Sequence, residues 1–252
     1  MKGERGVKQA KTKRLIPFAL AAAACVLVPA IASAGVVVAS SGPSASSFPV
    51  GKKIGDSEKI VLRAGDALTV LDGKGTRVLR GAGTFSLDQQ AGPNKSGTFA
   101  VLTERRSAQR MRTGAVRGDE VTGQVQPPNL WYVDLAKPGK VCLAETDRVR
   151  IWRNTTDGEA SYTLSPAGGG KSETINFGDG DMLTPWDTAG LPVTAGQVYR
   201  IADARGNAVG ELSFAILNPV AEEPEALAQQ LIENGCTRQL ELLSSATMVT
   251  EG

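Results

Sequence analysis

Short apolar runs separated by turn residues dominate this chain, and they limit it to folds built mainly from β-strands. The sequence contains 29 glycines and 13 prolines. Most of the runs between them are too short for helices, and they are rich in valine and threonine. Glycine readily adopts the positive φ that tight turns require, so these interruptions indicate hairpins and loops. The turn from Asp72 to Gly75 between two apolar runs is the clearest example.

The strand pattern falls into two regions. Residues 57–104 predict a small β-meander, to which 97–103 adds a further strand. Residues 129–220 contain six or seven candidate strands at intervals typical of an antiparallel, Ig-like β-sandwich. Between these regions, residues 105–128 form a polar, arginine-rich connector. The predicted fold class is therefore mainly β: a small N-terminal β-meander followed by an antiparallel Ig-like β-sandwich with a C-terminal helix.

Residues 221–246 carry the one pattern typical of helices. Pro224 occupies a first-turn position, where its missing N–H costs nothing. Asn234 and Gly235 predict a break between two helical pieces. Residues 247–252 are expected to be a tail. Apolar residues of this segment recur on one face, namely Leu227, Leu231, Cys236, Leu240 and Leu243.

The N-terminus has the composition of a secretory signal peptide. Six basic residues precede Leu15, and an uncharged apolar run then continues to Ala34. The run ends in small residues directly before Gly35, as a signal peptidase requires. We therefore expect residues 1–34 to be a signal peptide. The serine- and glycine-rich stretch that follows predicts a flexible linker over 35–56.

Two other interpretations of the N-terminus stay open. Residues 15–39 are long enough to anchor the chain uncleaved in the inner membrane, with the remainder on the far side. Small residues before Cys25 also permit a lipoprotein, although the apolar run continues beyond that cysteine. The expected location is periplasmic or secreted. Contact with a membrane is expected only if the segment stays uncleaved.

Removing the leader changes the charge of the chain. The whole sequence has 28 basic and 26 acidic residues, of which the leader holds six and one. The remainder therefore carries a net charge of −3. A mildly acidic protein gives no reason to expect nucleic acid as a partner.

The composition also argues against common catalytic chemistry. The chain contains no histidine, which removes the usual base that activates a serine or cysteine nucleophile. We therefore expect no catalytic residue, no metal and no cofactor, and we regard a binding protein as more consistent with the sequence than an enzyme. A hydrolase that uses carboxylates on cell-wall polymer remains an alternative.

Two short motifs resemble ligand sites but lack their context. Residues 168–172 read Gly-Gly-Gly-Lys-Ser, yet Ser165 stands where a phosphate-binding loop has its first glycine. Residues 178–181 place two aspartates at alternate positions without the remaining acids of a calcium loop. Both motifs predict turns, and a single weak calcium site at the second stays open.

The cysteines predict one disulfide. Only Cys142 and Cys236 remain after the leader is removed, and pairs of cysteines in an oxidising compartment are usually bonded. Two separate buried thiols are the alternative. The bond would attach the C-terminal helical segment to the strand region.

Two groups of side chains are candidates for a binding surface. The connector has a basic patch that suits an acidic partner, and the spacing places Arg106 and Arg110 on one helical face. The candidate residues of the patch are Arg105, Arg106, Arg110 and Arg112. The alternative for these arginines is a solvated helix or linker. The three tryptophans could form a stacking surface for carbohydrate, or they could belong to the core; they are Trp131, Trp152 and Trp186.

Part of the first region resembles a known family. The runs at 61–66, 68–71 and 76–85 are short, are separated by glycine turns, and are similar to the β-repeat of FecR-type periplasmic domains. The resemblance covers residues 60–87. It implies a small β-structure on the exported side of a bacterial signalling system. The first 14 residues, six of them basic, show no counterpart of the cytoplasmic segment that such regulators use.

Taken together, these patterns predict an exported, non-enzymatic envelope protein that binds another envelope protein or a cell-wall polymer. A membrane-anchored periplasmic sensor of the FecR-like kind is the second hypothesis. The carboxylate-based cell-wall hydrolase is the third.

Overall fold

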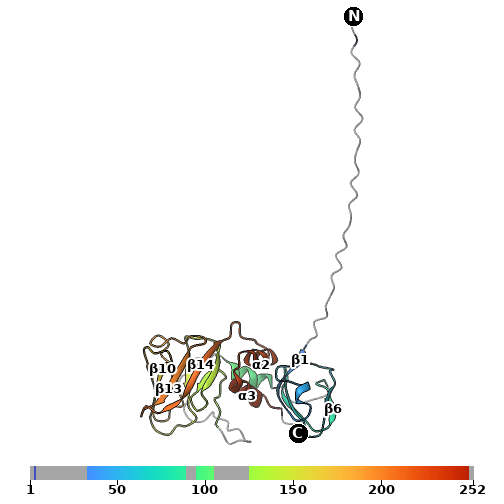
Figure 1. Cartoon of the computed structure of the whole chain (residues 1–252), viewed down its shortest axis with the longest axis horizontal. Coiled ribbons are helices and arrows are strands. Elements are labelled where there is room, and N and C mark those ends of the chain that lie inside the picture. Colours follow the sequence, from blue (N-terminus) through green and yellow to red (C-terminus); the bar gives the residue numbers. More distant parts are fainter. Residues whose placement is uncertain (1–2, 4–32, 89–94, 105–124, 250–252) are drawn as a thin grey trace. The chain divides into compact units, whose positions relative to one another are not determined.

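The computed structural model describes residue 3 and residues 33–88, 95–104 and 125–249. The chain divides into two units, Met1–Ile31 and Ala32–Gly252, and every element below belongs to the second unit (Figure 1). The expected leader lies almost entirely outside the described residues. Within the described ranges, no helix is both long and apolar enough to cross a bilayer.

Four antiparallel strands form the first sheet, in the order β2-β1-β4-β5. Their bounds are β1 Ser33–Ser41, β2 Lys53–Gly55, β4 Ala67–Asp72 and β5 Gly75–Arg80. A second sheet pairs β3 (Ile60–Leu62) with β6 (Gly83–Phe85). The two sheets share one core, made of Val37, Phe48, Ile54, Ile60, Leu62, Leu68, Val70, Leu79 and Leu87. A meander was expected over 57–104, but β3 pairs with β6 rather than with β4, so only β4 and β5 are paired in sequential order there.

Strand β1 is buried on both faces, which explains its three consecutive valines. Successive side chains of a strand point to opposite faces of the sheet. Val37 packs in the core of the first two sheets, whereas Val36 and Val38 pack in a second cluster with the C-terminal helices. Continuous apolar runs are typical of strands that are covered on both sides.

This strand corrects two expectations about the N-terminal region. Residues 35–56 were expected to be a flexible linker, but they carry β1, the 3-10 helix η1 (Ala45–Ser47) and β2. A membrane anchor over 15–39 is also wrong in that form, because residues 33–39 belong to a strand in the sheet. Any membrane segment has to end before Ser33.

The second β region contains a five-stranded and a three-stranded sheet around one core. The larger has the order β11-β10-β13-β14-β8 and the smaller β12-β9-β7. Strands of the larger sheet are β8 Gly139–Leu143, β10 Ala160–Pro166, β11 Glu173–Phe177, β13 Val198–Asp203 and β14 Ala208–Ile216. Strands of the smaller are β7 Tyr132–Asp134, β9 Arg150–Trp152 and β12 Leu183–Pro185.

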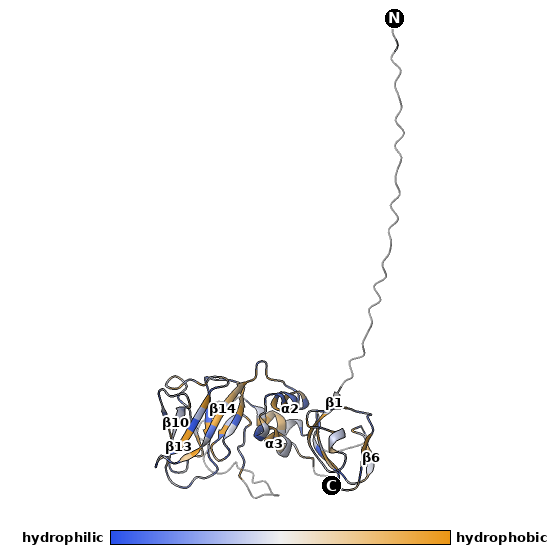
Figure 2. Cartoon of the chain, viewed as in Figure 1, coloured by the Kyte–Doolittle hydropathy of each residue, from blue (hydrophilic) through white to orange (hydrophobic). Residues whose placement is uncertain are grey.

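Both sheets of this region contribute side chains to the same core. It includes Val133 and Ile151 from the smaller sheet and Leu164, Tyr199 and Phe214 from the larger. Figure 2 shows hydrophilic and hydrophobic residues mixed along β13 and β14, as expected for strands with one buried face. The region is not wholly antiparallel, because β14 pairs with β8 and β7 pairs with β9 in parallel.

Three α-helices lie in the described part of this unit. They are α1 Ser96–Thr103, α2 Pro224–Glu233 and α3 Thr237–Ala246. The expected strand at 97–103 is therefore wrong, since that segment forms α1. The predicted break between α2 and α3 is confirmed: Gly235 has φ of 70°. Its N–H bonds to Ile232 and that of Cys236 to Leu231, which is the hydrogen-bond pattern of a Schellman motif.

The helices contact both β regions through one apolar cluster. Helix α2 contacts β1 and β4, and α3 contacts β5 and β8. The cluster takes Val36, Val38 and Leu71 from the first sheet, Cys142 and Ala215 from the five-stranded sheet, and the rest from helices and connecting segments. The five apolar residues predicted to share a helical face are all buried.

The segment after α3 is part of the fold rather than a free tail. The N–H of Val249 donates to the carbonyl of Thr76 in β5, and the N–H of Thr76 donates to the carbonyl of Thr247. The hydroxyl groups of these two threonines lie 2.9 Å apart. Residues 247–249 thus cover the beginning of the β5 edge.

Candidate functional site

Helix α3 is attached to the edge of the five-stranded sheet by a buried glutamine. The amide of Gln239 accepts a hydrogen bond from the N–H of Cys142 at 2.6 Å and donates to the carbonyl of the same residue at 2.7 Å. It also donates to the carbonyl of Leu130. One side chain thereby satisfies backbone groups of edge strand β8 as a neighbouring strand would. Because these backbone groups already have partners, another strand cannot pair with the β8 edge at that point.

The predicted disulfide joins the same two elements. Cys142 in β8 and Cys236 at the start of α3 are bonded, with their Cα atoms 5.9 Å apart. Both cysteines are fully buried. Because Cys236 and Gln239 are three residues apart, they lie on one face of the helix, and together they attach α3 to β8.

A shallow hollow lies beside this junction. Its volume is about 40 Å³, which is room for water molecules or one small polar group. The lining residues are Glu104, Asn129, Trp131, Tyr132, Leu143, Ala144, Glu145, Arg148, Val149 and Arg150. They come from the end of α1, the segment before β7, and the region between β8 and β9.

The floor of the hollow is held rigidly. The indole N–H of Trp131 donates to the carbonyl of Thr103, 2.8 Å away. The amide of Asn129 donates to the carbonyl of Glu104 and accepts from the N–H of Trp131. These bonds connect α1 to the segment that leads into β7, so the hollow depends on tertiary contacts rather than on a local motif.

Both signs of charge line the hollow. Arg148 pairs with Glu145 at 2.7 Å, with half of the arginine side chain exposed. Burial raises the pKa of the Tyr132 phenol, and the nearby positive charge of Arg150 opposes this effect. Tyr132 therefore stays protonated at neutral pH. This arrangement can hydrogen-bond a small polar group.

The three tryptophans do not form the stacking surface that was considered. Trp131, Trp152 and Trp186 are 9%, 1% and 3% exposed. They also belong to three different clusters. Trp186 packs edge-on against Tyr199 and Phe214 in the core of the second β region. The stacking expectation is wrong because the rings fill the interior, where each contributes a large apolar area.

The four candidate arginines, Arg105, Arg106, Arg110 and Arg112, lie outside the described residues. The described residues stop at Glu104, which lines the hollow, and resume at Val125.

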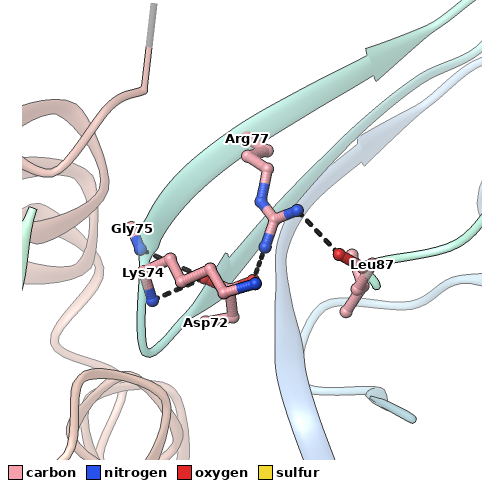
Figure 3. Close-up of polar contacts among 5 residues, drawn as sticks. All are labelled: Asp72, Lys74, Gly75, Arg77 and Leu87. Carbon is pink, nitrogen blue, oxygen red and sulfur yellow. Dashed lines mark hydrogen bonds and ion pairs between the residues drawn. The ribbon is translucent and has the colours of Figure 1, made fainter. Parts of the chain in front are cut away.

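A buried ion pair stabilises the hairpin between β4 and β5. Arg77 forms an ion pair with Asp72, and each residue is 5% exposed. Asp72 also accepts the backbone N–H groups of Lys74 and Gly75, and Arg77 donates to the carbonyl of Leu87, 3.0 Å away (Figure 3). Burial lowers the pKa of the Arg77 guanidinium, and the charge of Asp56 opposes this. These contacts join the two strands and the turn between them, so the pair stabilises the hairpin.

The two motifs that resembled ligand sites are turns. Residues 168–172 connect antiparallel strands β10 and β11, so they lack the helix that a phosphate loop needs. At 178–181, the buried side chain of Arg153 donates to the carbonyls of Gly178 and Asp181. Among the described residues, no group of three or more His, Cys, Asp or Glu side chains could hold a metal ion.

Sequence reasoning missed several residues that organise this region. Gln239 had one available signal, its position three residues after a cysteine that was expected to be bonded. Arg77 and Arg153 had none, because the sequence does not distinguish a buried arginine in or next to a strand from a solvated one. Their roles depend on carbonyl groups contributed from elsewhere in the chain.

Comparison with known proteins finds no matching family model, no similar curated protein and no similar solved structure. Function therefore has to be argued from the residues and geometry of this chain.

Proposed function

We propose that this chain is an exported, non-enzymatic protein of the cell envelope that binds another envelope protein or a cell-wall polymer. The observation that carries the proposal is the disulfide between Cys142 and Cys236. Thiols in the cytosol are kept reduced, whereas such bonds persist in the periplasm or outside the cell. The basic, apolar and small-residue order of residues 1–34 supports the same location.

We also propose that β7 to β14 form an Ig-like sandwich. The order β11-β10-β13-β14-β8 supports this, because Ig-like domains of the variable type likewise extend one sheet beyond three central strands. The three-stranded sheet would be the opposite layer. Pairing of β7 with β9 in parallel is a departure from the usual antiparallel arrangement. The fold alone would not specify the ligand, since sandwiches of this kind have many functions.

The proposed partner surface is the arginine-rich connector together with the hollow lined by Glu104, the residue that precedes the connector in the sequence. A concentration of positive charge on a mature chain of net charge −3 would direct binding toward an acidic polymer or acidic protein surface. The hollow adds polar groups at a point held by Trp131 and Asn129. Such binding should weaken as salt is added, because exposed charges are screened.

The test compares two triple variants with the same change in charge. The first removes the connector charges: Arg105→Glu, Arg106→Glu and Arg110→Glu. The control places the same charges on exposed arginines elsewhere: Arg63→Glu, Arg80→Glu and Arg205→Glu. Sedimentation with purified cell wall and photocrosslinking from position 110 in intact cells measure the polymer and protein partners. We expect the first variant to lose most binding and the control to retain it. Equal binding by both variants contradicts the assigned surface.

The membrane-anchored sensor is a second candidate, favoured by the position of β1. The strand begins at Ser33, directly after the apolar run, so no spacer separates a retained segment from the sheet. A span ending before Ser33 would be connected to the strand between β2 and β4. Intact-mass measurement of protein from the host separates the candidates: a chain starting at Gly35 rules out the anchor, and a chain retaining residues 15–32 supports it.

A further inference from the structure

The peptide bond expected to be cut by a signal peptidase lies near the N-terminal end of strand β1. The small residues Ser33 and Ala34 precede Gly35, and all three belong to β1. Ser33 is paired with Gly55 in β2, and the register shifts at Ala34, which has no partner strand residue. Gly35 has partners on both sides, Ile54 in β2 and Asp72 in β4. The backbone is therefore held by both neighbouring strands from Gly35, directly after the bond.

The surroundings of Gly35 leave no space for a protease. A Cβ atom added to Gly35 would lie 2.8 Å from the side chain of Val70 and 3.0 Å from that of Leu87. A protease has to bind the residues around the bond as an exposed, extended segment, which requires local opening of the fold. Opening here would also expose Val36 and Val37, which are 1% and 0% exposed.

We propose that the folding of β1 protects the Ala34–Gly35 bond, so that leader removal and formation of the first sheet exclude each other. This inference rests on the export part of the proposed function. In cleavage, water adds across the peptide bond: Ala34 receives a carboxylate and leaves with the leader, and Gly35 receives a free amino group. A chain whose sheet forms first keeps its apolar segment. The order of the two events thus selects between a free and a tethered protein.

The test uses the full-length chain in detergent with a purified bacterial signal peptidase. Leu68→Ala weakens the first sheet without changing the cleavage residues, because Leu68 in β4 is 1% exposed and pairs with Ser40 of β1. Leu164→Ala is the matched control, since Leu164 is 0% exposed but belongs to the core of the second β region. Intact mass reports the fraction of chain that starts at Gly35.

We expect the wild type and Leu164→Ala to resist cleavage and Leu68→Ala to be cut at least tenfold faster. Equal rates for the wild type and Leu68→Ala overturn the proposal, as does equally fast cleavage of both variants, which would indicate general unfolding. A peptide of residues 22–42 tests separately whether a signal peptidase recognises the bond before Gly35. If the unfolded peptide is not cut before Gly35, the predicted leader is wrong, whatever the folded variants show.

Discussion

Replacing Gln239 by leucine should destabilise the protein by removing the link between α3 and β8. The substitution keeps the approximate shape of the side chain but leaves three backbone groups without partners: the N–H and carbonyl of Cys142 and the carbonyl of Leu130. Gln239 is 5% exposed, so water does not readily replace it. A buried polar group left unpaired costs about 1–3 kcal/mol.

The expected net loss in the free energy of unfolding is at least about 2 kcal/mol, because three unpaired groups cost at least about 1 kcal/mol each and the buried leucine side chain returns about 1 kcal/mol. Gln230→Leu is the control. Gln230 accepts from the N–H of Ala221 and donates to the carbonyl of Pro219, but it is partly exposed, and its loss should cost about 1 kcal/mol or less.

Urea unfolding, followed by tryptophan fluorescence with the disulfide intact, measures both changes. Hydrogen exchange should also show faster exchange of the Cys142 amide in Gln239→Leu, because that N–H loses its acceptor. If Gln239→Leu and Gln230→Leu differ by less than about 0.5 kcal/mol, the inferred role of Gln239 at the strand edge is refuted.

Three further outcomes are expected. Replacing both disulfide cysteines by alanine opens a loop with a sequence separation of 94 and should lower the free energy of unfolding by about 4–5 kcal/mol in the chain-entropy model. Thermal unfolding without reductant measures this loss, and a loss below about 1 kcal/mol contradicts the prediction. Asp72→Ala should cost about 3–5 kcal/mol by removing the buried carboxylate that pairs with Arg77, and the double variant Asp72→Ala/Arg77→Met should cost less. Denaturant unfolding measures both losses, and a double variant that loses the sum of the two single losses would refute the coupling. Hydrogen bonds from Ser44 lower the pKa of Asp66. The wild type should therefore be more stable than Asp66→Asn near neutral pH, and this difference in the free energy of unfolding should disappear as the pH falls through the lowered pKa. Unfolding curves between pH 7 and 2.5 test this, and a difference independent of pH speaks against it.

Local patterns in the sequence determined much of the second half of the fold. The helical pattern of 221–246, its break at Gly235 and the pairing of Cys142 with Cys236 were all predicted and are confirmed. Such features depend on spacing along the chain: a glycine that can adopt positive φ ends a helix wherever the helix lies. The hairpin turn from Asp72 to Gly75 follows from the same kind of local chemistry.

Other features were decided only by the tertiary structure. The sequence alone does not decide what the run Val36-Val37-Val38 becomes. It fits the end of a membrane segment, the start of the chain after a leader, or a strand, because an apolar run does not specify what covers it. Only the core on one side and the helices on the other make it a doubly buried strand. For the same reason, the burial of the tryptophans, the amide bonds of Gln239 and the hollow at Glu104 could not be predicted from spacing. Each depends on groups that lie far apart in the sequence and meet when the chain folds.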